Sequence, residues 1–342
     1  MAAHQQGIPA AVDTPDVEDS PSIDTSSETA RDDDSAIDGM SSASSTVSLQ
    51  SSLYASVEEN GRTYHRYKEG KYPLPNDAKE QERLEIQHEL FRATLRGRLY
   101  LAPIESPKEV LDIATGTGVW AVEFANDHPE SNILGTDLSA IQPLYIPPNL
   151  RFEIDDAEDE WLFSNQFDYI HGRALLSCFT DPSAVLKSAF NALAPGGYLE
   201  LQDGIFPMEY VGEPPVESNL YKWNQLVVEG STKSGRPWTN VRHYKRWMQE
   251  IGFEDVVEKE FYWPTSQWPK GSYLKGVSNW WQKDFLQGLD GISMRIFTGT
   301  LGWSVEKMKE FTDEVRKDVV NKEIHAYLPI RVVYGRKPGN AP

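Results

Sequence analysis

The chain has 342 residues, 39% of them hydrophobic and 11% aromatic, which is enough to build a core of ordinary size in one or two domains. Its formal net charge of −19 opposes the counterion release that drives nucleic-acid binding, so we expect no direct contact with nucleic acid or with an anionic membrane. Cys178 is the only cysteine, which excludes an intramolecular disulfide and a multi-thiolate metal site. No apolar run approaches the roughly 18 residues of a membrane span, and the first residues lack the features of a secretory signal. We therefore expect an intracellular protein, in the nucleus or the cytoplasm.

The charge is concentrated at the N-terminus. Residues 1–60 contain twelve Asp or Glu and a single basic residue, Arg31, and no aromatic residue precedes Tyr54. Such a segment buries too little apolar surface to offset its ordering entropy, so residues 1–57 are predicted to form a disordered acidic tail. A cap segment over 58–105, an α/β domain over 106–336 and a short C-terminal tail over 337–342 are predicted to follow.

The predicted elements after the tail begin with a helix. Asp77 and Glu80 have capping-box spacing and predict a helix from there to about Leu99. Short apolar strands are then predicted at 109–113, 132–136, 150–154, 167–171, 198–202, 253–261 and 327–334. Helices are predicted at 119–126, 182–193 and 240–251, and a Pro-Gly-Gly turn at 195–197. This alternation predicts a Rossmann-like, doubly wound, mostly parallel seven-stranded sheet, with a helical insertion at about 263–323 before the last strand.

A glycine-containing turn joins the first strand of that sheet to its first helix. Gly116 and Gly118 allow close approach of the backbone to a ligand, and ligands bind beyond the carboxyl ends of the strands in such sheets. Asp112 precedes the glycines, and its carboxylate would repel the diphosphate of a dinucleotide. It suits a cofactor that carries an ammonium group, such as the methionine part of S-adenosylmethionine. No Lys-Ser or Lys-Thr pair follows the glycines, which excludes a P-loop.

Further carboxylates follow the next two strands. Asp137 ends the second strand nineteen residues after Gly118, where it can accept hydrogen bonds from both ribose hydroxyls. Asp155 and Asp156 end the third strand, where an acidic side chain can accept the adenine amino group. We predict that these residues bind the cofactor together with the intervening backbone: Asp112, Ala114, Gly116, Thr117, Gly118, Asp137, Leu138, Asp155, Asp156 and Ala157. A hard-cation site among Asp155, Asp156, Glu158, Asp159 and Glu160 is an alternative, but neighbouring residues cannot all face one ion, so no metal is predicted.

Four segments resemble one family. They are 58–65 (Glu-Glu-Asn-Gly-Arg-Thr-Tyr-His), 137–143 (Asp-Leu-Ser-Ala-Ile-Gln-Pro), 193–197 (Leu-Ala-Pro-Gly-Gly) and 321–327 (Asn-Lys-Glu-Ile-His-Ala-Tyr). Together with the glycine turn they resemble the class I S-adenosylmethionine-dependent methyltransferases, and among them the fungal LaeA-like proteins of secondary metabolism, over about 58–338. The family's loop usually reads Gly-x-Gly-x-Gly, whereas Ala114 takes the first place here. The resemblance implies S-adenosylmethionine as cofactor. It leaves open a small-molecule or a protein methyl acceptor, and a regulatory role with velvet-type protein partners.

Methyl transfer requires mainly that donor and acceptor be held at attack distance, and a general base helps only if the acceptor must lose a proton. His171 and Arg173, at the end of the fourth strand, are the catalytic candidates, with Arg173 pairing either with an acidic acceptor or with Asp156. Tyr64, with His65 and Tyr67, is predicted to close over the cofactor, because aromatic faces stabilise cations such as a sulfonium.

Two further readings of the sequence remain. Trp280, Trp281 and Trp303 either line an acceptor pocket or pack the helical insertion. A nicotinamide oxidoreductase is the alternative enzyme class, which Asp112 and the lack of a Tyr-x-x-x-Lys pair oppose.

Overall fold

A computed structural model describes residues 55–339, so the predicted acidic tail lies outside the described residues except at its end. That end is strand rather than tail, because β1 (Ser56–Glu59) pairs with β2 (Arg62–His65) in a small antiparallel sheet. The turn between them places Asn60 and Gly61 at φ values of 52° and 74°, which asparagine and glycine tolerate best. Residues 56 and 57 thus correct the predicted boundary of the tail.

The main sheet is an α/β sheet whose central strands run parallel. The parallel strands are β3 (Glu109–Ile113), β4 (Asn132–Asp137), β5 (Leu150–Ile154), β6 (Phe167–Arg173) and β7 (Leu193–Gly204). The antiparallel strands are β8 (Glu209–Tyr210), β9 (Glu254–Pro264) and β10 (Ala326–Arg336). The order is β5-β4-β3-β6-β7-β10-β8, with β9 also paired to β10. The chain order reverses at β3, which places the ligand crevice of such sheets above β3 and its neighbours.

The sheet has eight strands rather than the predicted seven. All seven expected strands are present, and the additional strand is β8, whose two residues pair with the start of β10. The predicted Pro-Gly-Gly turn is also wrong, because it lies inside β7, where Gly196 adopts a φ of 86° and bonds to Lys337.

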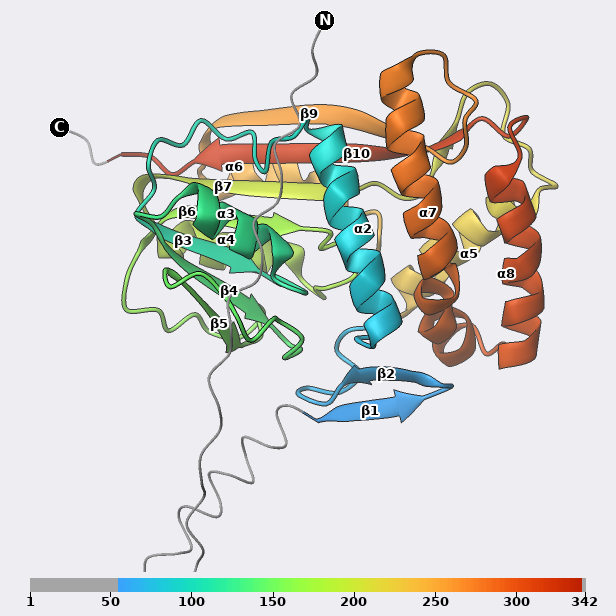
Figure 1. Cartoon of the computed structure of the whole chain (residues 1–342), viewed down its shortest axis with the longest axis horizontal. Helices are drawn as coiled ribbons and strands as arrows, with labels where there is room; N and C mark the ends of the chain where they lie inside the picture. The colour runs from blue at the N-terminus through green and yellow to red at the C-terminus, as the bar shows by residue number, and fades with distance from the viewer. Residues whose placement is uncertain (1–54, 340–342) are drawn as a thin grey trace, which may run out of the picture. The chain divides into compact units, whose positions relative to one another are not determined.

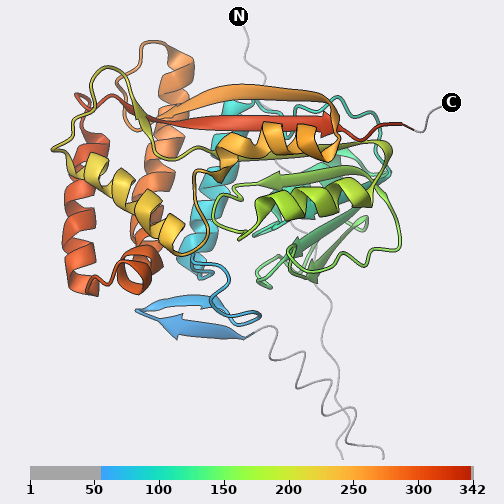
Figure 2. The same ribbon diagram turned by 180° about the vertical axis from the view of Figure 1, so that it is seen from behind.

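Helices cover both faces of the sheet (Figures 1 and 2). On one face, α3 (Val119–Asp127) packs Trp120 and Phe124 against Val110 and Ile133. On the other face, α4 (Pro182–Ala192) packs against β7. Helix α6 (Tyr244–Ile251), which follows a short 3-10 helix, η1 (Asn240–His243), packs against β9 and β10. Alternate side chains of buried strands point to opposite faces, so both faces of the central strands are apolar.

Helix α2 (Ala78–Thr94) begins where the sequence predicts and ends early. The Asp77 side chain accepts a hydrogen bond from the Glu80 backbone N–H, as the cap requires. The helix stops at Thr94 rather than Leu99, because Arg96 and Gly97 take positive φ values of 56° and 83°. Figure 1 shows α2 alongside α7, and the two helices are in contact.

A group of helices lies at one end of strands β9 and β10, beside the sheet (Figures 1 and 2). It consists of α5 (Asn219–Lys233), α7 (Ser272–Arg295), a π-helical turn η2 (Ile296–Thr300) and α8 (Val305–Val320). All but α5 lie between β9 and β10 in the chain. Their apolar residues form one core with α2 and the ends of β9 and β10. Within residues 55–339, no helix is long and apolar enough to span a membrane.

Candidate active site

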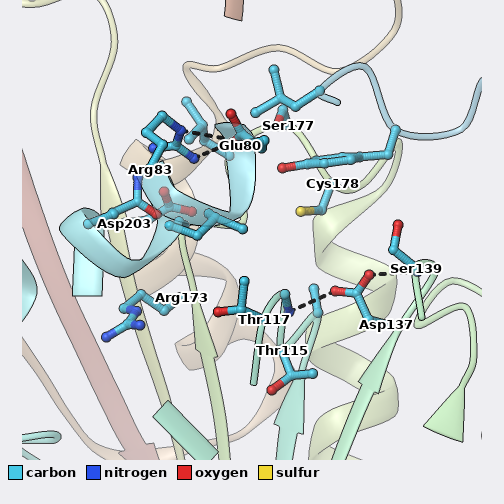
Figure 3. Close-up of a pocket in the computed structure, with 18 of the residues that line it drawn as sticks. Glu80, Arg83, Thr115, Thr117, Asp137, Ser139, Arg173, Ser177, Cys178 and Asp203 are labelled. Atoms are coloured by element: carbon cyan, nitrogen blue, oxygen red, sulfur yellow. Dashed lines mark hydrogen bonds and ion pairs between the residues drawn. The ribbon is translucent and has the colours of Figure 1, made fainter. Parts of the chain in front are cut away.

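A pocket of about 180 Å³ opens at the carboxyl ends of β3, β4 and β6 and continues between α2 and α7. It brings together nearly all the residues predicted from the sequence: Asp112, Ala114, Gly116, Thr117, Asp137, Leu138, Asp155, Asp156, Ala157, His171 and Arg173. Figure 3 shows Asp137 and Cys178 on one side of the pocket and Arg83, Asp203 and Arg173 on the other.

The loop from β3 to α3 adopts the backbone conformation that its glycines permit. Gly116 has a φ of 61°, and Ala114, at the position where the family has glycine, has a φ of 50°. A non-glycine residue costs about 1–2 kcal/mol in this region, so Ala114 keeps the loop geometry at some expense of stability. Gly118 is not among the residues that line the pocket, so its role in cofactor binding stays a prediction. A Cβ there would clash with the Phe152 ring, so this glycine lets β5 pack beneath the loop.

Asp112 is held between two donors. Its Oδ1 lies 2.7 Å from His171 Nδ1, and its Oδ2 accepts a hydrogen bond of 2.5 Å from Thr115 Oγ1. The His171 ring stacks on Trp120 with a centroid distance of 3.7 Å, and burial lowers the pKa of His171 below its usual value. His171 Nδ1 is thus committed to Asp112, while its Nε2 is buried without a hydrogen-bond partner among residues 55–339, so the catalytic role of His171 stays a prediction.

Asp137 faces both the glycine loop and the loop that follows β4. Its Oδ2 accepts the Gly116 N–H at 2.9 Å and its Oδ1 accepts the Ser139 N–H at 2.8 Å, as drawn in Figure 3. Burial raises the pKa of Asp137 to about 6, against the opposing effect of these two N–H groups. A carboxylate has about four lone-pair sites, so two remain for a ligand hydroxyl.

Asp156 is paired with lysines rather than with Arg173. Burial tends to raise its pKa, but hydrogen bonds from Lys68 and Lys71 outweigh that effect and hold it below the usual value. The Lys68 Nζ lies 2.8 Å from Asp156 Oδ2, and Lys71 also pairs with Asp156. Lys68 further contacts Asp159, and Lys71 further contacts Glu158. These cations neutralise the cluster that a hard-cation site would need, which removes that alternative. Among residues 55–339, no lysine forms an ion pair with Asp155.

Arg173 is half-buried and has no carboxylate partner among residues 55–339. Its Nη2 lies 3.1 Å from His88 Nδ1, and its guanidinium sits 4.9 Å above the Phe91 ring. Among residues 55–339 no carboxylate lies within 4.0 Å of it, and burial lowers its pKa to about 10. Of the two predicted partners of Arg173, Asp156 is therefore wrong, and a half-buried cation lines the pocket together with Asp112.

Tyr64 does not reach the pocket. It is fully buried beneath the Arg295 guanidinium, at 3.5 Å from the ring centroid, so it anchors the hairpin to α7 and is not a cofactor ligand. Tyr72, which the sequence did not single out, lines the pocket instead. Its backbone N–H bonds to His65 Nε2 at 3.2 Å, so the His65 of the hairpin fixes the loop that carries it.

The far end of the pocket is an aromatic chamber, defined here by Phe91, Phe206, Trp238, Trp263, Trp281 and Phe285. Of the three tryptophans considered from the sequence, only Trp281 lines the pocket, whereas Trp303 packs against Phe297 at a centroid distance of 5.0 Å.

Acidic side chains project among the rings of the chamber. Asp284 of α7 pairs with Arg83 of α2 at 2.8 Å, and Arg83 also binds Glu80 at 2.7 Å. Burial raises the pKa of Asp284 to about 6 and that of Asp203, at the end of β7, to about 7. Sequence patterns identified Glu80 only as part of the helix cap, and they did not identify Arg83, Asp203 or Asp284.

Comparison with known proteins places the chain in a family. A model of the methyltransferase domain matches residues 86–258. Methyltransferase pytC of Aspergillus terreus is 35% identical over 298 residues, which cover 86% of this chain and 92% of that protein. The probable methyltransferase tdiE of Emericella nidulans is 36% identical over 261 residues, covering 76% and 82%. The secondary metabolism regulator laeA of Aspergillus fumigatus is 31% identical over 304 residues, covering 88% and 82%.

The chain belongs to the fungal LaeA-like class I methyltransferases. This methyltransferase uses S-adenosylmethionine, as the resemblance implied, and the nicotinamide alternative is wrong. The pocket suits that cofactor on its own chemistry, because its methionine part carries an ammonium and a carboxylate. Asp112 and Arg173, which has no carboxylate partner among residues 55–339, offer one charge of each sign.

Proposed function

We propose that this methyltransferase transfers a methyl group to a small-molecule acceptor of fungal secondary metabolism, bound in the aromatic chamber. The observation that carries the proposal is the continuity of one pocket from the glycine loop to the chamber. Small-molecule sites are concave, largely apolar and provided with a few placed polar groups, and this chamber has those properties.

The residues at the β3 and β6 ends would hold the amino-acid part of the cofactor. Asp112 Oδ1 and Oδ2, oriented by His171 and Thr115, would accept the ammonium group. Arg173 would donate to the carboxylate, which gives the half-buried guanidinium the counter-charge that it lacks among residues 55–339.

The residues at the β4 and β5 ends would hold the nucleoside. Asp137 would accept the ribose hydroxyls through the lone pairs that Gly116 and Ser139 leave free. Asp155 fits the adenine amino group better than Asp156, because Asp156 is already bound by two lysines.

When bound, S-adenosylmethionine supplies a methyl group already activated on a sulfonium, so that the acceptor's lone pair displaces a neutral thioether. The chain then has only to orient the acceptor, exclude water and hold any proton that is released. Asp203 Oδ2 is the position for that proton, because it lines the pocket and its pKa of about 7 lies near neutrality. It accepts a hydrogen bond from Tyr244 at 3.1 Å, which fixes its direction.

A regulatory role through protein partners, including velvet-type proteins, is the second candidate. It is supported by the 31% identity to the secondary metabolism regulator laeA, which spans 88% of this chain. An Asp137→Ala variant returned to a deletion strain separates the two roles. We expect it not to restore the metabolite profile, whereas a regulator that acts without methyl transfer would restore it.

The direct test uses S-adenosylmethionine labelled with deuterium on the methyl group. The purified chain is incubated with the small-molecule extract of a fungal host lacking its gene, and products are found by mass spectrometry. We expect a small molecule with a fully deuterated methyl group, which the Asp137→Ala variant does not form. Label found only in the protein fraction, or in no product, would contradict the proposal.

A further inference from the structure

Two buried polar atoms in the aromatic chamber have no hydrogen-bond partner among residues 55–339. They are the indole Nε1 of Trp281 and the carboxylate Oδ2 of Asp284, whose residues are 4% and 1% exposed. Both residues line the pocket and both belong to α7. Because residues three apart are neighbours on a helix surface, a donor and an acceptor lie side by side on one face of α7.

The unpaired Trp281 N–H contrasts with other buried indoles of the chain. Trp120 donates to the Leu99 carbonyl at 3.1 Å, Trp223 to Ser293 Oγ at 2.9 Å, and Trp263 to Thr94 Oγ1 at 2.7 Å. Buried donors are almost always paired, because an unpaired donor loses its bond to water without replacement. An unpaired donor in a ligand pocket therefore indicates a partner on the ligand.

Asp284 is fixed in direction by Arg83. The Arg83 Nη1 donates to Asp284 Oδ1 at 2.8 Å, and its Nε and Nη2 donate to Glu80 Oε1 at 3.0 and 2.7 Å. Arg83 is thus committed to two carboxylates of the chain, and Asp284 Oδ2 is left as an acceptor. Together with Asp203, these carboxylates would repel an acceptor molecule that carries a carboxylate of its own, and so weaken its binding.

The walls of the chamber are ring faces and edges. Trp281 stacks on Phe285 with a centroid distance of 5.1 Å and an interplanar angle of 15°, and it lies 5.2 Å from Trp263. Phe91 meets Trp263 edge-on at 4.9 Å. Aromatic side chains favour offset stacked and edge-to-face partners, so a flat ring system is the shape that such walls accept.

We propose that the chamber binds a fused-ring aromatic acceptor whose edge carries a carbonyl oxygen next to an N–H or O–H group. The carbonyl accepts from Trp281 Nε1, and the adjacent N–H or O–H donates to Asp284 Oδ2. Lactams and ortho-hydroxy carbonyl compounds are the chemical class. This inference rests on the function proposed above, because it names the acceptor of the same site.

The test uses three bicyclic probes and the full chain saturated with S-adenosylhomocysteine, with binding measured by calorimetry. 2-Quinolone offers the carbonyl and the adjacent N–H, quinoline offers an acceptor alone, and quinoline-2-carboxylate adds a negative charge. We expect 2-quinolone to bind roughly tenfold more tightly than quinoline, and the carboxylate to bind most weakly. Trp281→Phe keeps a ring and removes the N–H, and should weaken 2-quinolone by roughly fivefold.

Asp284→Asn keeps an oxygen for Arg83 but presents a donor in place of Oδ2, so it should reduce the preference for 2-quinolone over quinoline. Trp280→Phe is the matched control, since Trp280 is the next residue and does not line the pocket, and it should change nothing. Equal affinity of the wild-type chain for 2-quinolone and quinoline, or an unchanged affinity in Trp281→Phe, would overturn the proposal. Failure of S-adenosylhomocysteine itself to bind would instead contradict the function on which it rests.

Discussion

The two ends of the pocket are built in different ways. We call the end that we propose binds the cofactor the cofactor end, and the aromatic chamber the acceptor end. At the cofactor end, Asp112 lies near the end of β3 and Asp137 ends β4, and backbone N–H groups of adjoining loops fix Asp137. At the acceptor end, the contacts join distant parts of the chain, such as Arg83 with Asp284, 201 residues apart, and Thr94 with Trp263, 169 apart. The first end follows from sheet topology, whereas the second follows from how α2, α7 and β9 pack together.

This difference separates what members of the family share from what distinguishes them. Strand ends place a cofactor in the same way whatever packs above them, because parallel strands converge at one edge. A chamber between helices changes with each side chain on those helices. The identity of the acceptor is therefore expected to depend on the α2 and α7 side, and cofactor binding to be independent of it.

The largest expected effect falls on the acceptor end. Arg83→Met leaves Glu80 and Asp284 buried without their cation, and should lower the free energy of unfolding by about 3–5 kcal/mol. Urea unfolding measures it. Arg151→Met is the control, because Arg151 pairs with Glu153 on the surface and should cost no more than about 1 kcal/mol. Equal costs for the two variants would show that the buried network does not hold α2 to α7.

At the cofactor end, Asp137→Ala should weaken the binding of S-adenosylhomocysteine by roughly ten- to over a hundredfold, because a charged hydrogen bond contributes about 1.5–3 kcal/mol. Asp137→Asn keeps one acceptor and should lose less. Asp168→Ala is the control, since Asp168 binds the N–H groups of Lys108 and Glu109 and does not line the pocket. If Asp137→Ala leaves affinity unchanged and only lowers stability, the carboxylate serves its loops alone.

The proton at the acceptor end gives a pH signature. Burial raises the pKa of Asp203 to about 7 from an ordinary 3.8, so the folded state holds this proton more tightly than the unfolded chain. The contribution of Asp203 to the free energy of unfolding is therefore fully present below about pH 4 and is lost as the pH rises to about 7. In Asp203→Asn, the free energy of unfolding should fall less steeply between about pH 4 and 7, by about 1 kcal/mol per pH unit. Parallel pH profiles for variant and wild type in urea unfolding would refute this.

The smallest of the four effects separates the binding of the amino-acid part of the cofactor from the binding of its nucleoside. Arg173→Met should weaken the binding of S-adenosylhomocysteine by about tenfold. It should leave unchanged the binding of 5′-methylthioadenosine, which lacks the amino-acid part. Arg173→Lys keeps the charge and should recover part of the loss. Calorimetry measures the affinity for both ligands. If the variant weakens the binding of both equally, Arg173 acts by packing against His88 and Phe91 and not by binding the carboxylate.

Much of the cofactor end could be predicted from the sequence because its signals are local. A carboxylate after a short apolar run marks a strand end, and Asp112, Asp137 and Asp155 each line the pocket where that pattern placed them. Gly118 and Tyr64 do not line the pocket, and sequence patterns missed this for a common reason. A glycine or a tyrosine near a site has the same local signature whether it faces a ligand or packs against Phe152 or Arg295.

The acceptor end was not predicted. Asp203 follows the predicted strand at 198–202 and carries the same strand-end signal, which was not used, whereas nothing near Asp284 in the sequence distinguishes it from a surface carboxylate. Only tertiary packing makes them buried, and burial is what raises their pKa values. The tryptophans were a partial signal, since they directed attention to Trp281 but not to Trp238 or Trp263. Helix α2 was likewise located by its cap, while its pairing with α7 had no local indication.

A crystal structure of the chain with S-adenosylhomocysteine tests the account most directly. We expect the ribose hydroxyls at Asp137, the ammonium group at Asp112 and the carboxylate at Arg173, with the sulfur facing the aromatic chamber. A cofactor whose carboxylate lies away from Arg173, or whose sulfur is closed off from the chamber by protein, would contradict it.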